Sequence, residues 1–207
     1  MVNSKVRKLR CGVFIDGSNV VWGSLNMESD VRWFVDYEKI KDYLKLHYKP
    51  QFYRFFGAID TEPKSPVFVE KAKMQARIYA KLEGMGYDVI LKPLKYIKQD
   101  DGTYKTKGDM DVELSMSAMD SINDLDTFVL FGGDCDYHPL IQRLHSQGKH
   151  IRIYSFDALL SWELRTFAIK NTRCSYKTID SLKDKFEYIK ITENVLTNNK
   201  TRSNIKK

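Results

Sequence analysis

The 207-residue chain has few cysteines and no long apolar run. Its three cysteines, Cys11, Cys135 and Cys174, are odd in number and none belongs to a CxxC pair, which argues against a disulfide framework and against a thiolate zinc site. The longest apolar run near the amino end is interrupted by Asp16, so the sequence predicts neither a signal peptide nor a membrane span. With 43% hydrophobic residues, the chain can form one sizeable core, and we expect a single cytoplasmic domain with tails.

Sequence patterns of several enzyme classes are also missing. The chain contains no GxSxG elbow, no Walker lysine loop and no GxGxxG fingerprint, so it gives no sign of a serine hydrolase, a P-loop nucleotidase or a dinucleotide-binding enzyme. Of only four histidines, His138 alone falls near a candidate site, where either a phosphate contact or a structural role fits it. Histidine therefore offers no competing catalyst.

Basic residues are concentrated at the two ends of the chain, which carries a net charge of +7. Residues 1–10 contain four basic and no acidic residues, and residues 189–207 contain five basic residues and one acidic residue, so the part between them is close to neutral. We predict a basic N-terminal tail at 1–10, one folded domain at 11–185 and a basic, flexible C-terminal tail at 186–207. Such tails either gather a polyanion or are simply solvated.

Short apolar segments alternate with longer segments of helical period, a pattern typical of βαβ units around a parallel sheet. We expect strands near residues 11–16, 52–59, 87–91, 127–132 and 150–155. We expect helices near residues 36–48, 66–84, 110–122, 137–147 and 160–169. The sequence therefore predicts an α/β fold with a central, mostly parallel sheet.

The segment before the third expected helix predicts a β-hairpin around Asp101-Gly102, a typical turn dipeptide. Four lysines of this hairpin would point towards the site: Lys95, Lys98, Lys105 and Lys107. Its tyrosines, Tyr96 and Tyr104, either stack on nucleobases or pack against the domain. In the helix that follows, Val112, Met116 and Met119 belong to an apolar stripe that we expect to pack in the core.

Aspartates follow two of the apolar strands at the point where each strand ends. Asp16 comes directly after residues 13–15, and Asp134 and Asp136 come shortly after residues 128–131. The carboxyl ends of parallel strands meet at one edge of a sheet, and open α/β sheets bind their ligands there. We therefore expect these three carboxylates to converge.

Two further aspartates, Asp109 and Asp111, stand where the third helix begins. Four of the five acids also have a structural alternative: Asp16 or Asp136 can cap the element that follows it, and the helix dipole stabilises Asp109 and Asp111 without a metal. Carboxylates without histidine or thiolate partners suit Mg²⁺ or Mn²⁺ better than Zn²⁺. The predicted ligands of one or two such ions are Asp16, Asp109, Asp111, Asp134 and Asp136.

The acidic stretches occur in an informative order, FIDGSNV, then KGDMDVELSMSAMD, then FGGDCDYHPLI and the strand GKHIRIYS, over about residues 10–170. Together they resemble the NYN domains, a PIN-like ribonuclease family that includes the LabA-like proteins. The resemblance implies a PIN-like three-layer α/β/α domain whose acidic pocket binds a divalent metal and cleaves RNA. The catalytic residues that it implies are Asp16, Asp111, Asp134 and Asp136.

The resemblance also includes a polar position, Asn19, beside the first acid, and it contains one departure. After the fifth strand the family often shows Ser and Leu followed by an Ala-Asp pair. Here Ser161, Leu164 and Ala168 fit that pattern, but Ile169 stands where the aspartate is expected. This departure puts the rate or the metal stoichiometry in doubt more than the class of reaction.

The leading hypothesis from the sequence is a metal-dependent endoribonuclease that acts on single-stranded or structured RNA. Its expected substrate-binding residues are Ser18, Asn19, Lys105 and Lys107. Two alternatives remain open: a non-catalytic PIN-like module that binds RNA or a protein, and another metal-dependent phosphohydrolase.

Overall fold

Six parallel strands form the central sheet of the computed structural model, which describes residues 9–26 and 32–189. The strands are β1 (Cys11–Asp16), β2 (Phe52–Ile59), β3 (Asp88–Pro93), β6 (Thr127–Phe131), β7 (His150–Ser155) and β8 (Cys174–Thr178), in the spatial order β3-β2-β1-β6-β7-β8. The chain winds outward from β1 in one direction and then continues from β6 in the other. The strand order therefore reverses between β1 and β6, which is where open α/β sheets form a ligand crevice.

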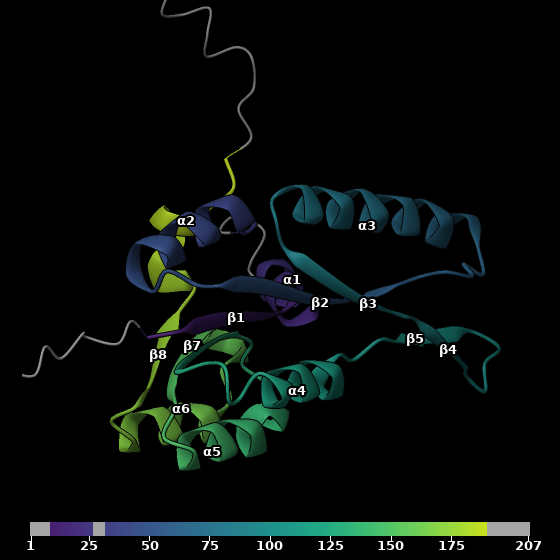
Figure 1. The fold of residues 1–207 in the computed structure, drawn as a ribbon. Helices are drawn as coiled ribbons and strands as arrows, with labels where there is room; N and C mark the ends of the chain where they lie inside the picture. Colours follow the sequence, from purple (N-terminus) through teal and green to yellow (C-terminus); the bar gives the residue numbers. More distant parts are fainter. Residues whose placement is uncertain (1–8, 27–31, 190–207) are drawn as a thin grey trace, which may run out of the picture.

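Helices cover both faces of this sheet (Figure 1). They are α1 (Gly17–Leu25), α2 (Tyr37–His47), α3 (Pro66–Gly84), α4 (Asp111–Asp120), α5 (His138–Ser146), α6 (Trp162–Lys170) and the short α7 (Lys183–Phe186). One core cluster joins the sheet to α1, α2, α3 and α7, and a second joins it to α4, α5 and α6. The predicted three-layer α/β/α architecture is confirmed.

The expected strands and helices all form, with small differences at their ends, but three elements were not predicted. They are the strand β8 and the helices α1 and α7. β8 is an edge strand in which buried or half-buried residues alternate with exposed ones, and it is polar and short. Edge strands of this kind carry a weaker apolar signal than the fully buried strands at the centre of a parallel sheet.

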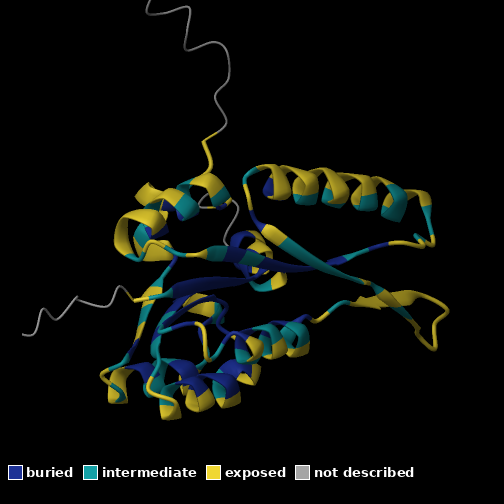
Figure 2. Cartoon of the chain, in the orientation of Figure 1, coloured by how far each residue is buried: buried dark blue, intermediate teal, exposed yellow. Residues whose placement is uncertain are grey.

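The predicted hairpin is confirmed and consists of β4 (Lys95–Lys98) paired antiparallel with β5 (Tyr104–Lys107). Asp101 and Gly102 lie in the turn. This hairpin is separate from the central sheet, extends away from it and is largely exposed (Figure 2).

The core prediction for the apolar stripe of α4 is wrong for two of its residues. Leu114 and Ala118 are buried, whereas Val112 and Met116 are 66% and 61% exposed. Val112 and Met116 are one turn apart, and each is two residues from Leu114, so the helix turns them to the side opposite its buried face. The buried face of α4 is therefore narrower than the predicted apolar stripe.

The basic tails predicted at 1–10 and 186–207 lie mostly outside the described residues. Where the chain is described, packing continues past residue 185: Phe186 is fully buried, and Glu187 forms a β-bridge with Val35. Within the same ranges, no helix is both long enough and apolar enough to cross a membrane.

Candidate active site

Asp16 lies at the carboxyl end of the central strand β1 and is buried. Its Oδ1 accepts a hydrogen bond of 3.0 Å from the backbone N–H of Asn19, so the residue also caps α1. Gly17 makes this tight passage possible: a Cβ at that position would lie 2.3 Å from the ring of Phe55 and 2.9 Å from the carbonyl oxygen of Phe56. The capping role and a place in the acidic site are therefore compatible.

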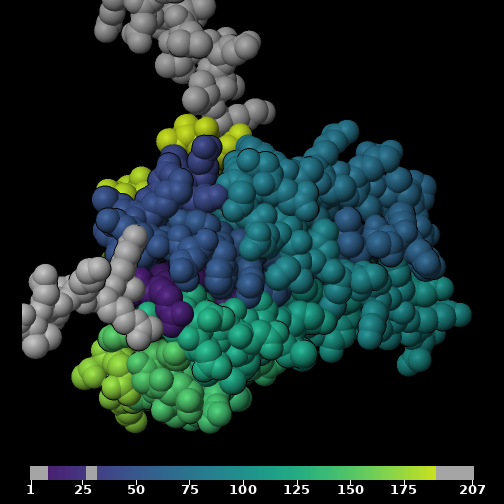
Figure 3. All heavy atoms as spheres, in the orientation of Figure 1, coloured from purple at the N-terminus to yellow at the C-terminus, as the bar shows by residue number. Residues whose placement is uncertain are grey.

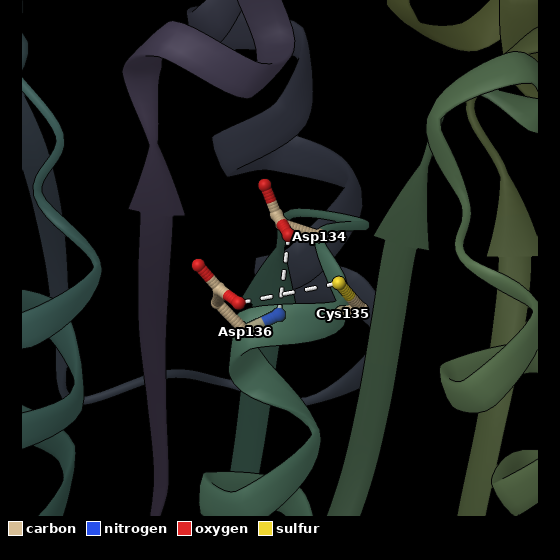
Figure 4. Close-up of side chains that lie close together, drawn as sticks. All are labelled: Asp134, Cys135 and Asp136. Atoms are coloured by element: carbon tan, nitrogen blue, oxygen red, sulfur yellow. Dashed lines mark hydrogen bonds between the residues drawn. The ribbon is translucent and has the colours of Figure 1, made fainter.

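Asp134 and Asp136 lie on the neighbouring strand connection, where β6 leads through the 3₁₀ turn Cys135–Tyr137 into α5. Both are exposed, and Asp134 Oδ1 accepts a hydrogen bond of 3.1 Å from the backbone N–H of Asp136 (Figure 4). Gly133 allows this turn to approach the next connection, because a Cβ there would lie 2.4 Å from the carbonyl oxygen of Leu159. The turn therefore sits at the strand edge next to β1.

The ligand atoms of Asp134, Cys135 and Asp136 all lie within 4.8 Å of one another, and no other group of three His, Cys, Asp or Glu residues among those described is as close. The Cys135 Sγ is 4.0 Å from Asp136 Oδ1 (Figure 4). Asp134 and then burial raise the pKa of the Cys135 thiol, so it stays protonated at neutral pH. Oxygen atoms are therefore the main ligands that this turn offers.

Tyr137 connects the two groups of acids and was missed by sequence reasoning. Its side chain is fully buried, and its hydroxyl donates a hydrogen bond of 2.9 Å to Asp16 Oδ2. The same hydroxyl also interacts electrostatically with Asp111, in the first turn of α4. Burial first, and then the charges of Asp16 and Asp111, raise the pKa of Tyr137 far above its usual value, so it acts only as a neutral group.

The carboxylates of this site repel one another. Burial raises the pKa of Asp16, hydrogen bonds from Asn19 and Tyr137 offset part of that increase, and the charge of Asp111 adds to it. Burial likewise raises the pKa of Asp111, and Asp134, Asp109 and Asp136 raise it further. The structure therefore brings all five predicted acids into one electrostatic network.

This network fits a hard divalent cation. Its donors are carboxylate oxygens, which Mg²⁺ and Mn²⁺ prefer. The raised pKa values of Asp16 and Asp111 indicate negative charge that a bound cation would stabilise. Asp109 lies at the solvent side of this network, since its side chain is 57% exposed and its carboxylate lies 3.1 Å from Lys107 Nζ.

The other predicted residues are more dispersed. Ser18 and Asn19 follow Asp16 in the first turn of α1, and Lys105 and Lys107 lie on the exposed strand β5. His138 packs edge-on against Phe167 with ring centroids 5.6 Å apart, which favours its structural alternative.

Tyr96 also follows its structural alternative, because its ring packs on Phe68 and its hydroxyl donates a hydrogen bond to Asp60. Ile169, the departure from the family pattern, is 70% exposed in the last turn of α6. This turn is about 10 Å along the helix from Trp162, the first residue of α6.

A pocket of about 780 Å³ opens beside the acids, between the hairpin and α4. Its walls combine both signs of charge with apolar surface. The lining residues are Lys92, Lys95, Lys107, Gly108, Asp109, Asp111, Val112, Ser115, Met116, Cys135, Asp136 and Pro139. Of the three lysines that line the pocket, Lys92 was not identified from the sequence.

Comparison with known proteins agrees with this geometry. The sequence pattern of the NYN domain matches residues 10–172. The chain belongs to the NYN domain family. This is a PIN-like family whose members are generally regarded as nucleases, and the resemblance found in the sequence is confirmed.

Two relatives of this NYN domain are informative. The low amplitude and bright protein LabA of Synechococcus elongatus is 26% identical over 161 residues, which cover 77% of this chain and 80% of LabA. The crystal structure of a protein of unknown function from Vibrio parahaemolyticus superposes with a TM-score of 0.64 at 23% identity, covering 87% of this chain and 97% of the other. The second likeness supports the fold alone.

Proposed function

We propose that this NYN domain is a metal-dependent endoribonuclease that hydrolyses phosphodiester bonds of RNA. The observation that carries the proposal is the network of acids, in which the buried Asp16 accepts a hydrogen bond from Tyr137 and repels Asp111, and Asp111 in turn is repelled by the exposed Asp134 and Asp136. Carboxylates that repel one another at the end of a strand are typical of functional sites, where a ligand or a metal offsets the repulsion. Membership of the NYN family supports RNA as the proposed class of substrate.

Asp16, Asp111 and Asp134 are the residues proposed to hold Mg²⁺ or Mn²⁺, with Asp136 and Asp109 beside them. A divalent ion in such a site activates a water molecule and neutralises charge on the phosphate. Tyr137 orients the two more buried carboxylates, and an exposed carboxylate of the turn can accept the proton of the attacking water.

Internal cleavage is proposed because the pocket beside the acids is open. Val112 and Met116 on its wall are largely exposed, so a strand can enter from the side rather than by an end. The hairpin lysines Lys105 and Lys107, together with Ser18 and Asn19, are proposed to contact the substrate around the acids.

The test is cleavage of labelled RNA by the purified full chain. Single-stranded RNA, stem-loop RNA and matched DNA are incubated with Mg²⁺, Mn²⁺ or EDTA. Asp16→Asn and Asp111→Asn are each expected to lower the cleavage rate by about a thousandfold or more. Asp120→Asn is the matched control, because Asp120 is exposed in the last turn of the same helix as Asp111.

Three outcomes contradict parts of the proposal. Cleavage that survives both site substitutions would reject the assignment of the acids. RNA that is bound but stays intact with every ion would favour the non-catalytic module. Preferential cleavage of the DNA would favour the other phosphohydrolase.

A further inference from the structure

The pocket beside the acids has an apolar wall to which the proposed function assigns no contact with the substrate. Val112 and Met116 face it from successive turns of α4, and Pro139 at the start of α5 lines it as well. Single exposed apolar residues are common on protein surfaces. These three share one pocket, however, and we call them the apolar strip.

The opposite wall is basic. In the hairpin, Lys95 pairs with Lys107 and Ile97 pairs with Lys105, so these four side chains share one face of the two strands. Since Lys95 and Lys107 line the pocket, this is the face turned to it. We call Lys92, Lys95 and Lys107 the lysine wall; Figure 3 shows the hairpin as a projecting end of the molecule next to α4.

The other face of the hairpin packs against the rest of the domain. There Tyr96 packs on Phe68 and its hydroxyl donates a hydrogen bond to Asp60. These contacts tie the hairpin to the body of the protein through the side that does not line the pocket. The hairpin that carries Lys95 and Lys107 is therefore anchored to the domain by residues of its other face.

Lysines of this wall already have acidic neighbours. Lys92 Nζ lies 2.9 Å from both carboxylate oxygens of Glu113, and Lys107 Nζ lies 3.1 Å from Asp109. All four side chains are at least 31% exposed. Ion pairs of this kind contribute little to stability, so a phosphate group can replace the carboxylate at small cost.

We propose that this pocket binds an unpaired nucleic-acid strand next to the acidic site, with its phosphates on the lysine wall and its bases on the apolar strip. The inference rests on the proposed function for the position of the scissile bond. The chemistry of the two walls favours a polymer that is charged along one side and flat and apolar along the other. Bases in a duplex are stacked and paired, so only an unpaired strand presents its base faces in this way.

The experiment measures binding without cleavage. A short, unstructured, fluorescently labelled RNA is titrated with the full chain in EDTA at low ionic strength, and its anisotropy is followed. A matched DNA strand and an RNA duplex are titrated in parallel. Each single strand is expected to bind more tightly than the duplex. Comparison of the RNA strand with the DNA strand shows which of the two nucleic acids the pocket prefers.

Variants of the two walls give different expected signatures. Lys95→Ala and Lys107→Ala should each weaken binding and reduce the slope of log affinity against log salt by about 0.7. Lys98→Ala is the control, since Lys98 lies on the other face of the same hairpin. Met116→Ala should weaken binding roughly fourfold without changing the salt slope, and Met74→Ala, 57% exposed on α3, is its control.

These results separate the pocket from the chemistry. Equal binding by the wall variants and their controls, or equal binding of duplex and single strands, would overturn the pocket assignment even if the protein cleaves RNA. Weakened binding by the wall variants, together with intact RNA in every metal ion, would retain the pocket and overturn the nuclease proposal.

Discussion

The four central carboxylates of the site are held in two different ways. Asp16 and Asp111 are buried or half-buried and both interact with Tyr137, Asp16 through a hydrogen bond, whereas Asp134 and Asp136 are exposed at the start of the 3₁₀ turn. The first pair is fixed by packing, and its raised pKa values mean that its charges destabilise the folded state at neutral pH. The second pair is hydrated and can adjust its position at little cost. The buried pair is thus preorganised, and the exposed pair can adapt to a ligand.

The strongest test of this contrast removes the hydroxyl that joins the buried pair. Tyr137→Phe is expected to lower RNA cleavage by about 10–100-fold, the usual effect of losing a group that orients a metal ligand. The rate is measured over a range of Mg²⁺ concentrations, because weaker metal binding would appear as a higher concentration for half-maximal rate. Tyr154→Phe is the control: it removes another buried hydroxyl, which lies 3.0 Å from Tyr48 Oη. Equal rates for the two variants would show that Tyr137 does not position the acids.

A second test compares the stability cost of the two pairs without metal. Asp16→Asn should raise the midpoint of thermal unfolding at neutral pH, because the amide avoids the burial of a charge. Its oxygen can still accept from the Asn19 N–H, and its NH2 group can donate to the Tyr137 hydroxyl, which then acts as the acceptor. The folded-state pKa of Asp16 is raised, so this gain should shrink as the pH falls through that pKa and the wild-type carboxylate becomes neutral.

The matched variant for this measurement is Asp134→Asn. The carboxylate of Asp134 is exposed, so the unfolding midpoint of this variant at neutral pH should stay close to that of the wild type. If the two variants change the midpoint by the same amount, burial does not distinguish the pairs. Both experiments are read by calorimetry in EDTA.

The smallest effect is expected at the thiol of the exposed turn. Cys135→Ser should change the rate in Mg²⁺ by less than about twofold, because Mg²⁺ prefers oxygen ligands and the thiol is kept protonated by its acidic neighbour. Cleavage assays in Mg²⁺ check this prediction. A loss of rate comparable to that of Tyr137→Phe would show that cleavage depends on the side chains of the exposed turn as strongly as on the buried pair.

Sequence reasoning predicted the central sheet well because its strands are buried. β1 and β6 are fully buried and read as continuous apolar runs, which is typical of parallel strands covered on both faces. The aspartates that follow them were then located by topology alone, since parallel strands end at the same edge. β8 carried no such signal because exposed polar residues alternate along it.

Two features of the site depend on tertiary packing and were out of reach. Nothing local marks Tyr137 as a bridge: its partner Asp16 is 121 residues away, and only the folded sheet brings the two together. Val112 and Met116 were expected in the core because apolar residues at helical spacing usually are. Their exposure follows from the position of α4 at the edge of the pocket, which the helix pattern itself does not contain.

The buried ring of Phe186 has a consequence for where this domain ends. It packs edge-on against Tyr43 of α2 and lies 6.3 Å from Phe131, the last residue of β6 before the acidic turn. The family segment ends at residue 172, before β8 and before this side chain. A fragment cut at that boundary would leave the aromatic core open directly beneath the strand that presents Asp134. The segment that matches the family is therefore shorter than the unit that packs, because β8 and the short helix α7 complete its core.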